Sequence, residues 1–377
     1  MISRSRRARA LGVLALLAVT ASACGSSSSS DASSATTAAA TTAAATTVVP
    51  AATDADSDST ATALATTEAA TTTAPPATVP PGTKLRVGDQ QNTLKLPLDG
   101  SGEATKLQSS VEYSTFAAGP PLVEAFNAGA IDLGYVGDTP PVLAAARGQD
   151  IVIVGAWHYN GNLIAVVAPP GKSITSVADL KGKKFAYTKG TALQAFALRA
   201  LKEAGLTEAD VETVDVPILD IVGALKSGDV DAGVVIEPIL TPYLKDNPDA
   251  KVVRDGKGLT TGLQLLITTK KTLEDPAKSA AIGDFIAREI ASTAWRQANP
   301  DEFAAKYAEA NQIDVAVAKS IIERNGVQPY VPIDEKLIGE LQILADVFFE
   351  AGAIPSKLDV HSVFDDRFND IVKAGNS

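Results

Sequence analysis

The chain has 377 residues and one cysteine, and its 33 Lys+Arg against 44 Asp+Glu give a formal net charge of −11 at pH 7. A disulfide within a chain needs two cysteines, and this chain has only Cys24. Zinc sites are built mainly from cysteine and histidine, and the only histidines are His158 and His361. The composition therefore excludes a disulfide scaffold and a Cys/His zinc module. The excess of acids also disfavours nucleic acid and anionic lipid surfaces as partners.

Residues 1–23 are predicted to be a signal peptide. Four arginines, the last at Arg9, precede an apolar run over residues 11–19 that is too short to cross a hydrocarbon layer about 30 Å thick as a helix. The small residues before Cys24 resemble the lipobox of bacterial lipoproteins, in which the cysteine is diacylated and becomes the new amino terminus. Ala21 and Ala23 also fit ordinary signal-peptidase cleavage. Both alternatives export the protein, and the first anchors it to the outer face of the cell membrane through Cys24.

Residues 24–83 are predicted to be a disordered tether. After Cys24 this segment is almost entirely Ala, Thr, Ser, Pro and Asp, and such a composition cannot bury enough apolar surface to offset the chain entropy lost on folding. With coil statistics its ends lie roughly 40–45 Å apart. We therefore expect the folded part to begin near Lys84.

From residue 84 onward, short apolar runs alternate with helical patterns. The predicted strands cover residues 85–88, 111–115, 132–136, 151–155, 163–168, 185–187, 232–236 and 265–268. The predicted helices between them cover residues 121–128, 140–147, 192–204 and 218–227. This alternation predicts an α/β fold with mainly parallel sheets covered by helices.

After Thr269 the pattern becomes wholly helical. The predicted helices cover residues 276–297, 301–311, 314–325, 334–350 and a last turn at 363–373. The first of them has one apolar stripe, formed by Ile282, Phe285, Ile286, Glu289, Ile290 and Thr293. We expect these late helices to pack outside the sheets and to carry no chemistry.

Three junctions between a strand and a helix share one design, at residues 116–121, 137–141 and 189–192. In open α/β sheets such junctions lie at the carboxyl ends of the strands, where unpaired N–H groups and the helix dipole favour anions. Thr139 and Thr191 are predicted N-caps, and Pro140 is predicted at the first helical position. Either the junctions form an anion site together, with Lys189 beside one of them, or each is simply a well-formed helix start.

The chain resembles a family of transport proteins in several segments taken together. These segments are residues 85–88, 116–129, 131–141, 177–184, 189–191 and 225–232. In this order they closely resemble the aliphatic sulfonate, taurine and nitrate binding proteins of ABC importers, and the resemblance covers essentially residues 84–377.

The resemblance implies a periplasmic-binding-protein fold of type II, with two α/β lobes joined by a hinge of two crossings and the ligand in the cleft. We expect the crossings near residues 168–172 and 262–269. Lobe one then comprises residues 84–169 plus 266–377, and lobe two comprises residues 170–265.

The resemblance also implies ligand-binding residues at matching positions. The anion-binding role falls on the first junction, with Phe116 and Gly119, and on the other two, with Asp138, Thr139, Lys189, Gly190 and Thr191. Gln91 and Asn92 match the first ligand loop of the family in location only.

Three other residues have two interpretations each. Trp157 either walls the organic part of a ligand or covers apolar surface. His158 is expected to be a hydrogen-bond donor to the ligand or a rim residue, since no nucleophile or metal partner is visible for it. Glu237, before Pro238, either receives a cationic group of a zwitterionic ligand or accepts backbone hydrogen bonds at the hinge.

The function implied by the resemblance is that of an importer's receptor. It captures a small anionic or zwitterionic ligand, such as an alkanesulfonate, taurine, nitrate or a larger heterocycle, and presents it to an ABC permease driven by its ATPase. A lipoprotein that senses a ligand or has a structural role, with no transporter, is the first alternative, and a cryptic enzyme is the second. Enzymes of this fold use a cleft cysteine, whereas Cys24 lies sixty residues before the first strand. We therefore expect a monomeric binder with no enzymatic activity, cofactor or metal.

Overall fold

The structure of the protein is a computed structural model that describes residues 78–376. The predicted signal peptide, Cys24 and most of the predicted tether lie outside the described residues. Val79 belongs to the predicted tether but is 5% exposed and packs in a core cluster with Leu85 and Leu98. The folded part therefore begins before Lys84.

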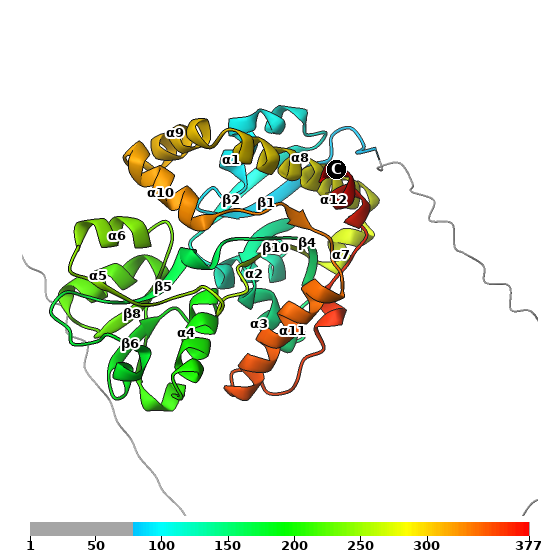
Figure 1. The fold of residues 1–377 in the computed structure, drawn as a ribbon. Coiled ribbons are helices and arrows are strands. Elements are labelled where there is room, and N and C mark those ends of the chain that lie inside the picture. The colour runs from blue at the N-terminus through cyan, green and yellow to red at the C-terminus, as the bar shows by residue number, and fades with distance from the viewer. Residues whose placement is uncertain (1–77, 377) are drawn as a thin grey trace, which may run out of the picture. The chain divides into compact units, whose positions relative to one another are not determined.

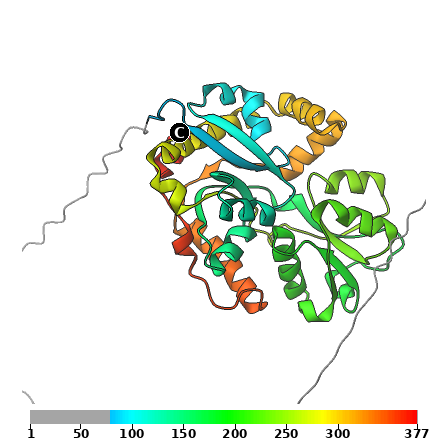
Figure 2. The same cartoon turned by 180° about the vertical axis from the view of Figure 1, so that it is seen from behind.

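The described chain is organised around two sheets (Figure 1). The first has six strands in the order β11-β4-β10-β3-β1-β2. The second has five strands in the order β7-β6-β8-β5-β9. Figure 2 shows the same arrangement from behind, with the blue and cyan strands in one group and the green strands in the other.

The strand bounds are as follows. The first sheet contains β1 (Lys84–Gln90), β2 (Ser110–Phe116), β3 (Leu133–Gly137), β4 (Val152–His158), β10 (Leu263–Thr268) and β11 (Tyr330–Val331). The second contains β5 (Ile164–Ala168), β6 (Lys184–Tyr187), β7 (Glu212–Asp215), β8 (Ala232–Ile236) and β9 (Lys251–Asp255). All eight predicted strands are present, and β7, β9 and β11 were not predicted.

Both sheets are mixed, so the prediction of mainly parallel sheets is wrong. Parallel pairing joins β1 to β2 and β3, and β6 to β7 and β8. The strand β10 is antiparallel to β3 and β4, and β5 is antiparallel to β8 and β9. Both β5 and β10 lie next to the points where the chain passes from one sheet to the other, and β11 is also antiparallel to β4.

The hinge differs from its predicted position. Because β5 lies in the second sheet and β10 in the first, the chain crosses between sheets at residues 159–163 and again at 256–262. The predicted first crossing at residues 168–172 is therefore too late, and residues 164–169 belong with lobe two. The second crossing ends where the predicted one begins.

Twelve α-helices occur in the described residues. Before the second crossing these are α1 (Lys95–Ser101), α2 (Gly119–Asn127), α3 (Thr139–Ala146), α4 (Ala192–Glu203), α5 (Ile221–Ser227) and α6 (Leu240–Asp246). After it these are α7 (Lys270–Glu274), α8 (Pro276–Ala298), α9 (Pro300–Asn311), α10 (Val315–Asn325), α11 (Glu335–Glu350) and α12 (Asn369–Gly375). The predicted helices are all present. None of the described helices combines the length and apolar character needed to span a membrane.

Local sequence explains the longest helix, α8. The Asp275 carboxylate accepts the backbone N–H groups of Ala277 and Lys278, and Pro276 occupies the first turn, where its missing N–H costs nothing. The helix ends before Asn299 because Pro300 cannot continue it.

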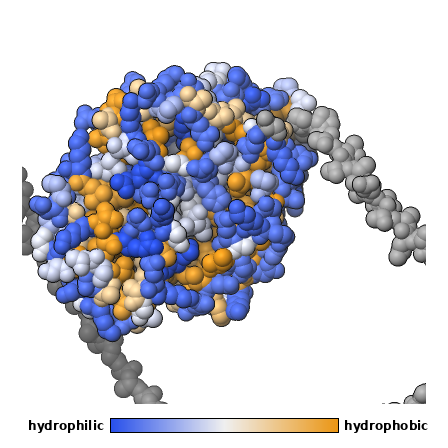
Figure 3. Space-filling view, viewed as in Figure 1, coloured by the Kyte–Doolittle hydropathy of each residue, from blue (hydrophilic) through white to orange (hydrophobic). Residues whose placement is uncertain are grey.

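Each sheet has its own apolar core, and α4 connects the two. Phe185, Tyr187 and Phe196 are fully buried around the second sheet. Ala195 and Leu198 of α4 instead pack with Leu143 and other residues of the first lobe. The face of the molecule in Figure 3 is mostly hydrophilic, with apolar groups exposed over both lobes.

Candidate functional site

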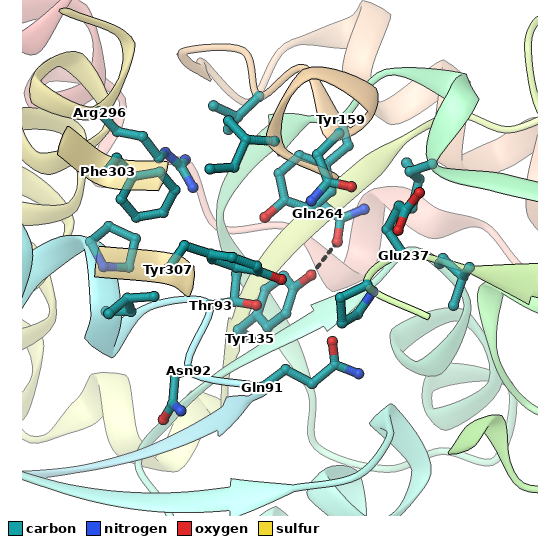
Figure 4. Close-up of a pocket in the computed structure, with 18 residues that line it drawn as sticks. Gln91, Asn92, Thr93, Tyr135, Tyr159, Glu237, Gln264, Arg296, Phe303 and Tyr307 are labelled. Atoms are coloured by element: carbon teal, nitrogen blue, oxygen red, sulfur yellow. Dashed lines mark hydrogen bonds between the residues drawn. The ribbon is translucent and has the colours of Figure 1, made fainter. Parts of the chain in front are cut away.

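A hollow lies between the lobes next to both hinge crossings, and Figure 4 shows the residues that line it. Its volume is about 100 Å³. Its lining residues are Gln91, Asn92, Thr93, Leu96, Pro97, Tyr135, Tyr159, Leu163, Ile236, Glu237, Pro238, Gln264, Arg296, Phe303, Tyr307, Ile322, Asn325 and Val327. The predicted residues Gln91, Asn92 and Glu237 are therefore brought together at one hollow.

The loop after β1 is shaped by a buried carboxylate. Gln91 and Asn92 have positive φ angles of 54° and 57°, a conformation that few residues other than glycine and asparagine adopt readily. Asp89, 1% exposed, accepts the backbone N–H groups of Leu94 at 3.2 Å and Lys95 at 3.0 Å. Burial raises the pKa of Asp89 from 3.8 to about 6, against the opposing effect of these backbone hydrogen bonds. Asp89 thus ties the loop to the start of α1.

Aromatic residues form the floor of the hollow. The Tyr135 hydroxyl donates to Gln264 Oε1 at 2.6 Å. Trp157 lies behind it, 3% exposed, with its ring stacked 5.5 Å from that of Tyr135 and 4.9 Å from that of Tyr330. Of the two interpretations of Trp157, the structure shows the one in which it packs against apolar surface.

His158 points away from the hollow because successive side chains of a strand alternate between faces. Its Nε2 lies 2.8 Å from Glu340 Oε2 on α11. The expectation of a ligand contact or a cleft-rim position is therefore not met, since His158 is absent from the hollow's lining. His361 is exposed and pairs with Asp359 and Glu335.

Glu237 lines the hollow but already has partners. Its carboxylate accepts the Thr241 hydroxyl at 2.6 Å and the Thr241 N–H at 3.2 Å. Arg324 Nε of α10 lies 3.0 Å from the same carboxylate. Burial raises the pKa of Glu237, while Thr241 and Arg324 act against that rise. The hydrogen bond to backbone near the hinge is thus the interpretation of Glu237 that the structure favours.

Three of the late helices, which were expected to pack outside the sheets and to carry no chemistry, contribute residues to the lining of the hollow. Arg296 of α8 lies with its Cζ 5.4 Å from the centre of the Phe303 ring of α9, and both line the hollow. Arg296 Nε is buried without a hydrogen-bond partner, as is Asn325 Oδ1 of α10. Arg296 follows Thr293, the last buried residue of α8, and is itself only half-buried.

The three predicted helix starts do converge. A Cβ placed on Gly119 would lie 2.3 Å from Pro140 Cγ, and one on Gly190 would lie 3.3 Å from Pro120 Cγ. The starts of α2 and α3 in one lobe and α4 in the other therefore touch. Phe116, at the end of β2, is half-buried against the core of the first lobe.

The polar groups at these starts are largely paired within the protein. Gly190 donates its N–H to Gln194 Oε1 at 2.8 Å, and the Thr191 hydroxyl donates to Thr188 O and accepts the Leu193 N–H. Thr191 is thus the N-cap of α4, as predicted. Thr139 is not an N-cap: α3 begins at it, and its hydroxyl donates to Asp138 Oδ1 at 2.9 Å.

Asp138 is buried between the lobes. Its carboxylate also accepts the hydroxyl of Thr261, in the second crossing, at 2.6 Å. Burial raises the pKa of Asp138, although both threonine hydroxyls and Arg199 of α4 favour the charged form.

Lys189 and Gly190 line a second hollow of about 210 Å³, distinct in its lining from the first. Its other lining residues are Pro120, Val123, Glu124, Pro140, Leu143, Ala144 and Arg147. Five of the predicted site residues are therefore divided between the two hollows, and the others line neither. In the described residues no group of three or more His, Cys, Asp or Glu side chains could hold a metal ion.

Two α/β lobes, joined by two crossings and enclosing a hollow beside the hinge, define a protein of the periplasmic-binding-protein fold. The chain belongs to the NMT1/THI5-like family, whose model matches residues 111–303.

Known proteins similar to the chain are consistent with this class. An Escherichia coli (strain K12) protein named "Putative aliphatic sulfonates-binding protein" is 29% identical over 279 residues, which cover 73% of this chain and 86% of that protein. The crystal structure of the periplasmic aliphatic sulphonate binding protein SsuA from Escherichia coli matches with a TM-score of 0.66 and 28% identity, over 74% of this chain and 97% of that one. The alkanesulfonate-binding protein SsuA from Xanthomonas axonopodis pv. citri bound to MOPS matches with a TM-score of 0.69 and 24% identity, over 76% and 99%. The last likeness shows the fold alone.

Proposed function

We propose that the protein is the extracytoplasmic solute-binding component of an ABC importer and that it captures a small sulfonate between its lobes. The observation that carries the proposal is the hollow beside the hinge, which is lined by residues from both sides of the crossings. A molecule bound there contacts both lobes at once, so its binding free energy favours the closed arrangement. The relatives named for aliphatic sulfonates support a sulfonate over other small anions.

The proposal includes delivery and anchoring. The closed, loaded protein presents its ligand to a membrane permease, whose ATPase subunit drives release and transport. Lipidated Cys24 holds the protein at the outer face of the membrane, and two or three acyl chains make such anchoring stable. The segment between Cys24 and the folded part is long enough to let the domain reach the permease.

The same reasoning argues against catalysis. A thiol nucleophile needs to sit in the cleft, and the sole cysteine of the chain is Cys24. His158, the histidine nearest to the hollow in sequence, is paired with Glu340. The chain therefore functions as a binder that releases its ligand unchanged.

A panel of thermal shifts on the mature protein tests this function. Taurine, ethanesulfonate, larger alkanesulfonates and nitrate are each added in excess, and a ligand at 100 times its dissociation constant stabilises the folded state by about 2.7 kcal/mol. We expect at least one sulfonate to raise the melting temperature. If no sulfonate raises the melting temperature, the proposed ligand class is wrong. Uptake into proteoliposomes that hold a permease and ATPase pair then separates an importer's receptor from a sensing lipoprotein.

A further inference from the structure

An arm of lobe one, made of α9 and α10, lies beside lobe two. Ala304 and Ala308 of α9 and Ala318 of α10 form an apolar cluster of their own, separate from the cores around the two sheets. The arm packs on lobe one through α9, since a Cβ on Gly100 of α1 would lie 3.1 Å from Lys306 Cδ. Figure 1 shows α10 next to α6 of lobe two. The arm therefore bridges the two lobes on one flank of the hinge.

Arg324, in the last turn of α10, connects the arm to lobe two. Its Nε lies 3.0 Å from Glu237 Oε1 and 3.2 Å from the Thr241 hydroxyl, and both partners belong to lobe two. Its Nη1 donates to the backbone oxygen of Asn162, in the first crossing, at 3.4 Å. One side chain of the arm thus contacts lobe two and also the crossing that joins the lobes.

The burial of Glu237 makes its contact with Arg324 important. The Glu237 side chain is 1% exposed, and that of Arg324 is 33% exposed. A carboxylate that is removed from water loses its hydration, and hydrogen bonds and a nearby cation restore part of that free energy. Thr241 belongs to the same lobe as Glu237 and moves with it. Arg324 is therefore the partner that Glu237 loses when lobe two moves away from the arm.

Two other ion pairs join the lobes, but both are exposed. Lys245 Nζ of α6 lies 3.4 Å from Asp314 Oδ2 at the start of α10, and Lys202 of α4 pairs with Glu350 of α11. All four of these side chains are more than half exposed, so water and salt screen both pairs. Of the three pairs, that of Arg324 is the one with a buried partner.

We propose that Arg324 is a positioning residue for lobe closure. Together with Glu237 it forms a latch that holds lobe two against the arm and sets how readily the lobes open and a bound molecule leaves. Arg324 itself does not line the hollow, so its effect on a ligand passes through the position of the lobes. The inference adds to the proposed function, on which it rests for the nature of the bound molecule.

Distances between two nitroxide labels, measured by pulsed electron paramagnetic resonance on the mature protein, test the latch without any ligand. Leu219→Cys in lobe two and Ile343→Cys in lobe one place the labels at exposed positions, and Cys24→Ser removes the native thiol. In Arg324→Gln we expect a second distance to appear, with the ratio of open to closed lobes raised about tenfold, because a hydrogen bond to a charged group is lost.

A double-mutant cycle shows whether Arg324 acts through Glu237. Glu237→Gln should open the lobes to a similar extent, and the variant with both changes should open little further, because each change removes the same contact. Arg324→Lys keeps the charge and should restore part of the closed population. If Arg324→Gln does not fold, Arg324→Lys and Glu237→Gln decide the question.

Lys319→Gln is the matched control, since Lys319 of α10 pairs with Asp301 of α9 inside the arm, at 2.7 Å. Its distance distribution should equal that of the parent protein. The inference is overturned if Arg324→Gln and Glu237→Gln also leave the distribution unchanged. It is equally overturned if the effect of the double variant is the product of the two single effects.

Stopped-flow kinetics with ethanesulfonate then separate the latch from the proposed function. Dissociation from Arg324→Gln is expected to be about tenfold faster than from the wild type, with Lys319→Gln unchanged. Equal dissociation rates in Arg324→Gln and the wild type would show that the latch does not retain the ligand. If the wild type binds no sulfonate at all, the proposed function is contradicted, and the label distances alone decide on the latch.

Discussion

The buried carboxylate of Asp89 should make the stability of the folded domain depend on pH in a predictable way. Burial raises its pKa from 3.8 to about 6, so the folded state holds a proton more tightly than the unfolded state. The contribution of Asp89 to stability is therefore fully present below pH 3.8 and is lost as the pH rises through about 6. At about 1.4 kcal/mol for each pH unit between the two values, the loss amounts to about 3 kcal/mol.

Replacing the residue isolates this effect from those of other acids. Asp89→Asn keeps an acceptor oxygen for the Leu94 and Lys95 amides but cannot ionise. We expect the free energy of unfolding of the variant, relative to wild type, to rise by about 2.4 kcal/mol between pH 4 and pH 7. Urea denaturation followed by circular dichroism at constant ionic strength measures the difference. The exposed Asp99→Asn on α1 is the control, with a much smaller change expected.

The reasoning is refuted if the difference between Asp89→Asn and wild type stays constant across this range. That outcome would mean that the carboxylate titrates at its ordinary pKa despite being 1% exposed. A steeper loss than predicted would instead indicate that Glu289, whose pKa burial also raises, titrates together with Asp89.

Three further substitutions test other parts of the structure. Arg324→Gln leaves the buried Glu237 carboxylate without its cation and should lower the free energy of unfolding by about 2 kcal/mol, read from chemical denaturation; no loss would show that the pair is screened by solvent. Gly119→Ala places a Cβ 2.3 Å from the rigid Pro140 ring and should destabilise the protein by about 1–3 kcal/mol, so an unchanged melting temperature would contradict the close packing of α2 and α3. Thr191→Ala removes the cap of α4 and should cost about 1 kcal/mol in the same assay, whereas equal stability would exclude a capping role.

The sequence predicts the elements of this fold better than their assembly. Periodicity locates the strands and helices because each element's apolar pattern is local. It does not say which sheet a strand joins: residues 164–168 are buried on both faces in the structure, so their sequence fits a central strand of either sheet. The hinge prediction failed for this reason, and the antiparallel pairing of β5 and β10 was missed with it.

In the candidate site, too, the sequence predicts local features but not how distant segments pack together. The loop after β1 and the Glu237 position could be predicted because they follow strands, where ligand loops gather in α/β proteins. Arg296 and Asn325 could not, since their approach to the hollow depends on how α8 and α10 pack against distant parts of the chain.

A crystal structure of the protein grown with taurine tests the central claim most directly. We predict the ligand in the hollow beside the hinge, with both lobes in contact with it. Ligand density beside Lys189 and Gly190 in the second hollow, or on one lobe only, would contradict the account.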